Sequence, residues 1–128
     1  MHVIKHVVNV TTAADGTAVA YTAEPLNGPI LKIIYTKPTS GGFATGVDFN
    51  ITTEDTGQTV WQENDVDASK SVAPVEKKQD TNGDDATLFN LGGSANVFGP
   101  IYAANERIKI SISNGGSGAT GQFVILEG

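Results

Sequence analysis

The sequence contains no cysteine among its 128 residues. This absence excludes a disulfide framework, a thiolate metal site and a cysteine nucleophile, and it is typical of proteins that fold in a reducing compartment. Long apolar runs are missing too, since stretches such as residues 33–35 are far too short to span a bilayer. The N-terminal residues MHVIKHVVNV carry Lys5 and His6 inside their apolar stretch and do not resemble a signal peptide. We therefore expect no membrane partner and folding in the cytoplasm.

Basic residues are few, with eight Lys and Arg against fourteen Asp and Glu and a net charge of −6. Ten of the acids lie between Asp48 and Asp85 together with only three lysines, so this region alone carries a charge of −7. Nucleic-acid binders place clustered Lys and Arg against phosphates. Because the chain has no such cluster, we expect no nucleic-acid partner.

Groups that could perform catalysis are scarce. Both histidines lie in the first six residues, and on a strand His2 and His6 would stand roughly 13 Å apart, too far to share one metal ion. No serine beside a glycine completes a G-x-S-x-G pattern. Carboxylate pairs such as Glu63 with Asp65 arise in any acidic loop by composition. The sequence therefore predicts no enzyme, no metal site and no cofactor.

The chain does contain the periodicity of β-strands. Residues 47–52 and 107–112 alternate apolar and polar side chains, which is the pattern of a strand with one buried and one exposed face. Four further segments are rich in β-branched and aromatic residues, namely 3–10, 17–23, 30–35 and 122–126. Turn-forming residues separate the strands at 14–16, 26–29, 40–42 and 55–57. This spacing predicts an all-β antiparallel β-sandwich or jelly-roll-like single domain over residues 1–128.

The middle of the chain is less regular. Residues 63–71 and 76–86 are polar and predict loops, with residues 72–75 between them as a short edge strand. Residues 86–90 predict a helical turn closed by the glycine pair that follows. No internal repeat and no linker divides the chain.

A literal G-x-G-x-x-G pattern occurs at residues 116–121. A dinucleotide-binding loop needs its third glycine to open a helix, because the helix N-terminus binds the pyrophosphate. Here Gly121 is followed by only seven residues, which alternate as a strand would. We interpret the pattern as a flexible hairpin loop that joins the last two strands.

The segment Asp80-Thr-Asn-Gly-Asp-Asp85 resembles the start of a calcium-binding loop. An EF-hand would place a glycine where Asp85 stands and would have a helix on either side. We therefore interpret the segment as a solvated turn. A calcium site of another kind stays open as the alternative.

Three aromatic residues are candidates for contact with a partner: Trp61, Phe98 and Tyr102. On a strand, Val60 and Trp61 would point to opposite faces, so one of them would face away from the core. Core filling is nevertheless the more frequent role of a lone tryptophan.

Several strings of the chain occur in a fixed order: VDFNITTEDTGQTVW from Val47, DVDASK from Asp65, ANERIKI from Ala104, and TGQF from Thr120 after a glycine-rich turn. In this pattern the chain resembles a group of small proteins that tailed bacteriophages and prophages encode near the major capsid protein. The resemblance covers roughly residues 18–128.

The resemblance implies a virion structural protein, namely a capsid decoration or cement protein on the capsid exterior. Its partner would be the major capsid protein, and it would form a homodimer or homotrimer. The alternative is a carbohydrate- or host-binding β-sandwich module on a phage fibre or tail. In that case Trp61, Tyr102 and the acidic loops would form a sugar-binding face.

Overall fold

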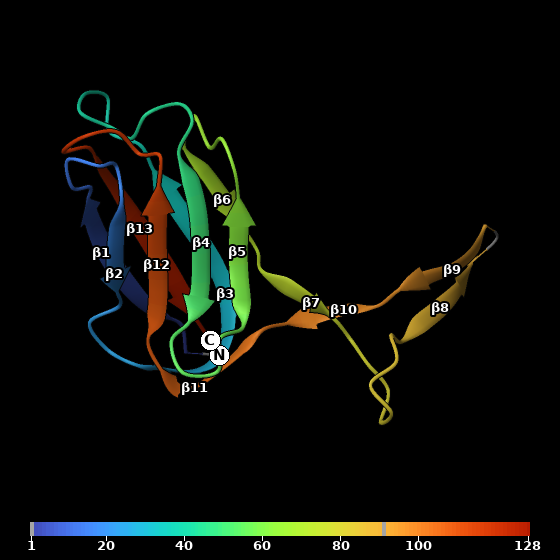
Figure 1. Ribbon diagram of the computed structural model, residues 1–128. Coiled ribbons are helices and arrows are strands. Elements are labelled where there is room, and N and C mark those ends of the chain that lie inside the picture. The colour runs from blue at the N-terminus through green and yellow to red at the C-terminus, as the bar shows by residue number, and fades with distance from the viewer. Residues whose placement is uncertain (1, 91) are drawn as a thin grey trace.

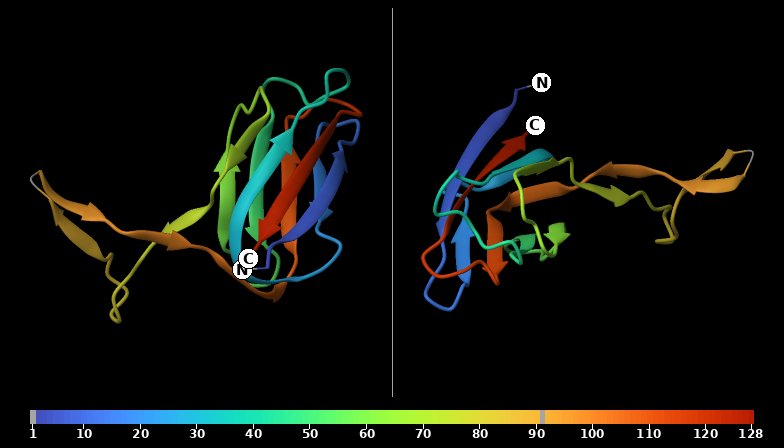
Figure 2. Two further views of the ribbon diagram at one scale, coloured as in Figure 1. Left: turned by 180° about the vertical axis from the view of Figure 1, so that it is seen from behind. Right: turned by 90° about the horizontal axis from the view of Figure 1, so that it is seen from above.

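The computed structural model describes residues 2–90 and 92–128, and it shows a β-sandwich from which a long arm projects (Figures 1 and 2). All pairings between the strands are antiparallel, which confirms the predicted all-β antiparallel class. The strands of the described residues are β1 (Ile4–Thr11), β2 (Ala18–Tyr21), β3 (Leu26–Thr36), β4 (Asp48–Thr53), β5 (Thr59–Glu63), β6 (Lys70–Val72), β7 (Val75–Lys77), β8 (Thr87–Asn90), β9 (Gly93–Asn96), β10 (Phe98–Pro100), β11 (Tyr102–Glu106), β12 (Ile108–Ser113) and β13 (Thr120–Glu127).

Two sheets face each other across the core. The first, which we call sheet A, has the strand order β1-β13-β3-β11, with β6 also paired to β3. The second, sheet B, has the order β2-β12-β4-β5. The long strand β3 uses its first half to pair with β11 and its second half to pair with β6. The chain therefore leaves the sandwich after β6 and returns to it at β11, and the arm lies between these two strands.

The core is built by the alternation that the sequence predicts. In β12, for example, Ile108, Ile110 and Ile112 are buried while the residues between them face outward. Aromatic rings fill the centre between the sheets, with Phe49 of β4 in edge-to-face contact with Tyr35 at 4.8 Å and with Trp61 at 5.2 Å between centroids. Such edge-to-face pairs stabilise a core beyond the area that they bury.

The predicted turn at residues 26–29 is wrong, because these residues begin β3 and pair with β11. Glycine and proline in this segment are tolerated because the strand is irregular here: Gly28 has a φ of 130°, and the β11 pairing shifts register between Ala104 and Glu106. The buried carboxylate of Glu127 also accepts the backbone N–H of Asn27. The Glu127 side chain thus supplies to Asn27 the acceptor that the backbone of a neighbouring strand would otherwise supply.

The segment 116–121 is not a hairpin loop, since the two strands that it joins belong to different sheets. It crosses from β12 in sheet B to β13 in sheet A. Thr12 holds it in place, because its hydroxyl donates to the carbonyl of Gly116 at 2.6 Å and accepts the N–H of Ala119 at 2.8 Å. Gly121 lies in β13, where a Cβ atom would stand 2.5 Å from the Phe43 ring. Close packing against aromatic rings therefore requires this glycine.

The middle of the chain also differs from its prediction. Residues 72–75 do not form one short strand but contribute to two, β6 and β7, which Ala73 and Pro74 separate. The predicted helical turn at 86–90 is wrong, because residues 87–90 are β8 in a hairpin with β9. Thr87 is β-branched, and its neighbours include aromatic and apolar types that favour strands.

A projecting arm as candidate interaction surface

The arm consists of residues 75–100 and extends away from the sandwich as a two-stranded ribbon (Figures 1 and 2). We call the rest of the described chain the body. At the base of the arm β7 pairs with β10, with Val75 opposite Pro100 and Lys77 opposite Phe98. Farther out, β8 pairs with β9. The ribbon is therefore held by its own backbone hydrogen bonds, and the two outer edges of its strands have no neighbour among the described strands.

A compact turn links the two parts of the ribbon. The carboxylate of Asp80 accepts the backbone N–H of Asn82 at 2.8 Å and that of Asp84 at 3.1 Å. Gly83 completes the turn with a φ of 86°. This is the usual way in which aspartate and glycine form a turn. In the part of the chain that the structure describes, no three His, Asp or Glu side chains gather closely enough to hold a metal ion.

The arm exposes large apolar side chains. Leu88 is 65% exposed, Phe98 54% and Val75 54%, and Tyr102 at the root of the arm is 57% exposed. The register places Val75, Phe98 and Pro100 on one face of the ribbon together with Lys77, because alternate residues of a strand point to the same side. Exposed apolar groups gathered in this way mark interaction surfaces.

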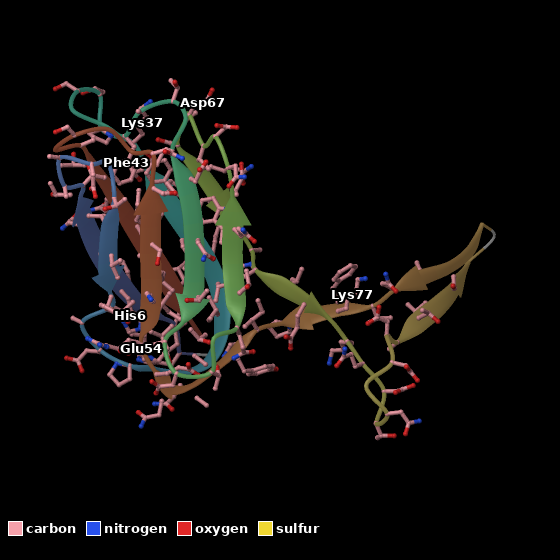
Figure 3. All side chains as sticks on the ribbon, in the orientation of Figure 1. His6, Lys37, Phe43, Glu54, Asp67 and Lys77 are labelled. Atoms are coloured by element: carbon pink, nitrogen blue, oxygen red, sulfur yellow. The ribbon has the colours of Figure 1, made fainter. Side chains whose placement is uncertain are left out.

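The arm is acidic overall, although one lysine, Lys77, lies on this face. The arm carries four acids and two lysines, so its net charge is −2. Lys77, labelled in Figure 3, forms an ion pair with Asp85 at 3.4 Å. A groove of about 600 Å³ lies at the base of the arm, and its lining is mostly charged and polar: Glu76, Lys77, Lys78, Gln79, Asp85, Gly99, Pro100 and Tyr102. The base of the arm thus combines exposed apolar side chains with charged groups, both of which occur in protein interfaces.

The three predicted contact residues fall in different places. Phe98 and Tyr102 stand exposed on the arm and at its root, whereas Trp61 is only 6% exposed and packs in the core. Val60 is buried as well, because the pairing of β5 with β4 shifts register at this point and turns both side chains inward. Trp61 is therefore removed from the candidate surface. The sequence does not predict Val75 and Leu88 as contacts. For Val75 the charged residues 76–78 that follow it are a signal of exposure, whereas Leu88 has apolar neighbours in the sequence and no such signal.

Two of the groups considered for catalysis, Glu63 and His6, take part in structural bonds. Lys70 donates to both oxygens of Glu63 at 2.9 and 2.8 Å, and this bond lowers the pKa of the Glu63 carboxyl. Trp61 donates to the same carboxylate through its Nε1. His6 lies 2.8 Å from a carboxylate oxygen of Glu127. His2 is exposed, and the structure does not bring the two histidines together at one site.

A second buried carboxylate, that of Glu106, joins the sheets at the lower end of the sandwich. It accepts the backbone N–H groups of Asp55 and Thr56, each at 2.9 Å, and the hydroxyl of Thr56 at 3.0 Å. Burial alone would raise the pKa of Glu106, but these hydrogen bonds outweigh it and lower the pKa. Such a carboxylate, with its oxygens occupied by backbone donors, serves the fold.

Comparisons with known proteins return few relatives. No family model matches the chain and no curated protein matches it. Among solved structures, the crystal structure of a protein named FLHE aligns over 99% of this chain and 98% of its own, with a TM-score of 0.45 and 10% sequence identity. A similarity of this size carries no argument about what this chain does. Residues 2–90 and 92–128 contain no helix with the length and hydrophobicity needed to cross a membrane.

The predicted function needs correction at this point. The sequence pattern indicates a bacteriophage capsid decoration protein, but no family model and no curated protein gives that function any support. The strings that suggest the resemblance largely form core strands and turns, which any antiparallel sandwich requires. We therefore withdraw the capsid function, and with it the alternative of a phage fibre or tail module.

Proposed function

We propose that this chain is a non-enzymatic binding protein that engages a protein partner through its arm. The observation that carries the proposal is the arm itself, a ribbon that projects from the body with Val75, Leu88 and Phe98 exposed. The body serves as a rigid mount for it. In this proposal the chain performs no reaction and needs no cofactor.

The physical instability of a lone ribbon supports this proposal. A two-stranded hairpin with no third strand and no covering layer is at best marginally stable in water. Its unpaired edges also offer backbone donors and acceptors to another chain. A partner that covers the apolar face or an edge would stabilise the ribbon, because it would remove apolar area from water and satisfy those backbone groups.

The solvent-exposed area of the chain also supports a protein partner. The chain exposes 7210 Å², whereas a compact protein of 13.3 kDa exposes roughly 6,450 Å². The excess is about 750 Å², close to the roughly 800 Å² that each partner buries in an interface of standard size.

Photo-crosslinking in the cells that make the protein tests this function. A benzophenone amino acid replaces Phe98 on the arm or, as a matched control, Tyr21, which is a 37% exposed aromatic residue on the body. We expect a covalent protein adduct after irradiation from position 98 and none from position 21. The adduct is then identified by mass spectrometry. Adducts of equal yield at both positions, or no adduct at position 98, would overturn the proposal.

A further inference from the structure

The outer face of sheet A is a second unpartnered surface, on the other part of the molecule. Val8 and Val10 of β1, with Phe123 and Ile125 of β13, point into the core. The alternate residues of these strands must therefore point outward, and so must those of β3.

Two rows of outward side chains cross the three strands in register. One row is apolar and consists of Val7, Val124 and Ile34, of which Val7 is 45% exposed. The next row consists of Lys5, Leu126 and Lys32. The outward positions of these three strands include no Asp or Glu. The face is thus apolar and basic on a chain whose net charge is −6.

The lysines of this face have no carboxylate partner in the described residues. Lys70, Lys77 and Arg107 each form an ion pair elsewhere in the structure, whereas none is formed by Lys5 or Lys32. The arm, in contrast, has a net charge of −2. Its acidic turn carries Asp84 and Asp85, of which Asp85 pairs with Lys77 while Asp84 forms no ion pair in the described residues. The two surfaces are therefore complementary in charge and both offer apolar contact.

We propose that the partner of the arm is a second copy of this chain, and that the arm packs across the outer face of sheet A of that copy. This inference rests on the proposed function. In this complex the Val7-Val124-Ile34 row of one copy contacts Val75, Phe98 and Pro100 in the arm of the other copy. The acidic turn of that arm lies near Lys5 and Lys32. The arm cannot make this contact within its own chain, because it leaves the sandwich at β6 and β11 and points away from it (Figure 2).

The dimensions suit this packing. Three strands spaced about 4.8 Å apart give a face wide enough for a two-stranded ribbon, which would lie on it as one sheet lies on another about 10 Å away. In a two-fold dimer each copy would donate an arm and receive one. The excess exposed area of about 750 Å² per copy is close to the roughly 800 Å² that each partner buries in an interface of standard size.

Charge reversal and its rescue test the inference. The purified full chain is examined by sedimentation velocity over a wide concentration range, and we expect a mass at a whole multiple of 13.3 kDa. Lys5→Glu with Lys32→Glu reverses the face, and Asp84→Lys with Asp85→Lys reverses the arm. Each double variant alone should raise the dissociation constant at least about tenfold, because like charges then meet in the contact.

A mixture of the two variants should associate again, since it pairs an acidic face with a basic arm. The matched control is Lys109→Glu, on the outer side of sheet B, compared with Lys32→Glu. It makes the same change in net charge and should leave association unchanged. Circular dichroism and thermal unfolding establish that the variants are folded.

Two results would overturn the inference. One is a wild-type chain that stays monomeric throughout, and the other is association that neither variant weakens or that the mixture does not restore. In the first case a crosslink from position 98 to a different protein would leave the proposed function intact. A monomer that also gives no crosslink would overturn both.

Discussion

The body and the arm are made from the same chain but use their side chains in opposite ways. In the body, the inward-facing residues of most strands pack into one cluster of twenty-one buried hydrophobic residues. In the arm, the described side chains stand largely in water, and Leu88 and Phe98 are more than half exposed. The body therefore holds itself together by burial, whereas the arm relies on backbone hydrogen bonds that water can reach.

The polar groups differ in the same way. Glu106, Glu127 and Thr12 in the body are buried, and other groups of the chain supply their hydrogen bonds. Asp80 in the arm makes comparable bonds, but on an exposed turn. A buried group that loses its hydrogen-bond partner bears the full desolvation cost, whereas an exposed group bonds to water instead. A hydrogen bond in the body therefore contributes more to the unfolding free energy than a bond of the same geometry in the arm. We expect the arm to open locally far more often than the body.

The largest difference in stability is expected between two variants that each lack one phenylalanine side chain, one in the body and one in the arm. Phe49→Ala should cost about 4 kcal/mol of unfolding free energy, because it leaves a cavity among four aromatic neighbours. Phe98→Ala should change the free energy by less than about 0.5 kcal/mol, since the ring is exposed. Urea unfolding of both variants at low protein concentration measures the difference. Similar losses in the two variants would show that the arm is part of the cooperative core.

A second comparison concerns the buried carboxylate. Glu106→Ala should cost about 3 kcal/mol, because the N–H groups of Asp55 and Thr56 lose their acceptor. Since the pKa of folded Glu106 lies below its ordinary value of 4.5, the stability that it contributes is complete above that pH. This stability is lost as the pH falls through the lowered pKa.

Glu106→Gln should therefore weaken the acid dependence of unfolding below about pH 4.5, a dependence that urea titrations at several pH values would measure. The part that remains belongs to Asp15, Glu54 and Glu63, whose pKa values are lowered by hydrogen bonds from Thr17, Arg107 and Lys70 respectively. A variant with the unchanged acid profile of the wild type would contradict the assignment to Glu106.

A smaller effect is expected from the hydrogen bonds of two turns. Thr12→Val keeps the shape of the side chain but leaves the buried N–H of Ala119 without its acceptor, at a cost of about 1–2 kcal/mol. Asp80→Ala in the arm should cost less than about 0.5 kcal/mol, because water replaces the lost acceptor. Thermal unfolding of the two variants compares them directly, and equal shifts in Tm would argue against the difference in burial as the cause.

Removal of the whole arm should also change the stability of the body only slightly. Val75 and Pro100 are paired across the ribbon, so a short glycine–serine turn can replace residues 75–100 without separating β6 from β11. The unfolding free energy of the body should change by less than about 1 kcal/mol, because the body core receives little from the arm. Hydrogen exchange provides a second measurement, with fast exchange in the arm and slow exchange in β3, β12 and β13. A body that unfolds without the arm would show that the two parts are not separable.

The sequence predicts the body well and the arm poorly. The segments around β1, β4, β12 and β13 are predictable as strands because their apolar residues recur at every second position. Residues 76–90 look polar and irregular in the sequence. Because both faces of the ribbon are largely exposed to solvent, its strands do not need to alternate apolar and polar residues. The predicted helical turn at 86–90 fails for that reason, and the sequence pattern does not reveal the β8–β9 hairpin.

The predicted contact residues also differ between the arm and the body. Phe98 and Tyr102 are candidates by residue type alone, because the sequence does not predict the burial of their segment, and the structure places both in water. Trp61 is a candidate because a regular strand cannot bury two successive residues, yet an irregular pairing of β5 with β4 does so. A register shift depends on the neighbouring strand, so no local pattern reveals it.

The sequence by itself determined the all-β class, the inward-facing residues of the regular strands and the excess of acid in the middle of the chain. These follow from local alternation and composition, which act over a few residues. Only the tertiary structure decided which strands share a sheet, that residues 116–121 cross between sheets, and that an acidic ribbon stands apart from a basic sheet face. These features depend on contacts between residues far apart in the chain, where many arrangements satisfy the same local pattern and only mutual packing selects one of them.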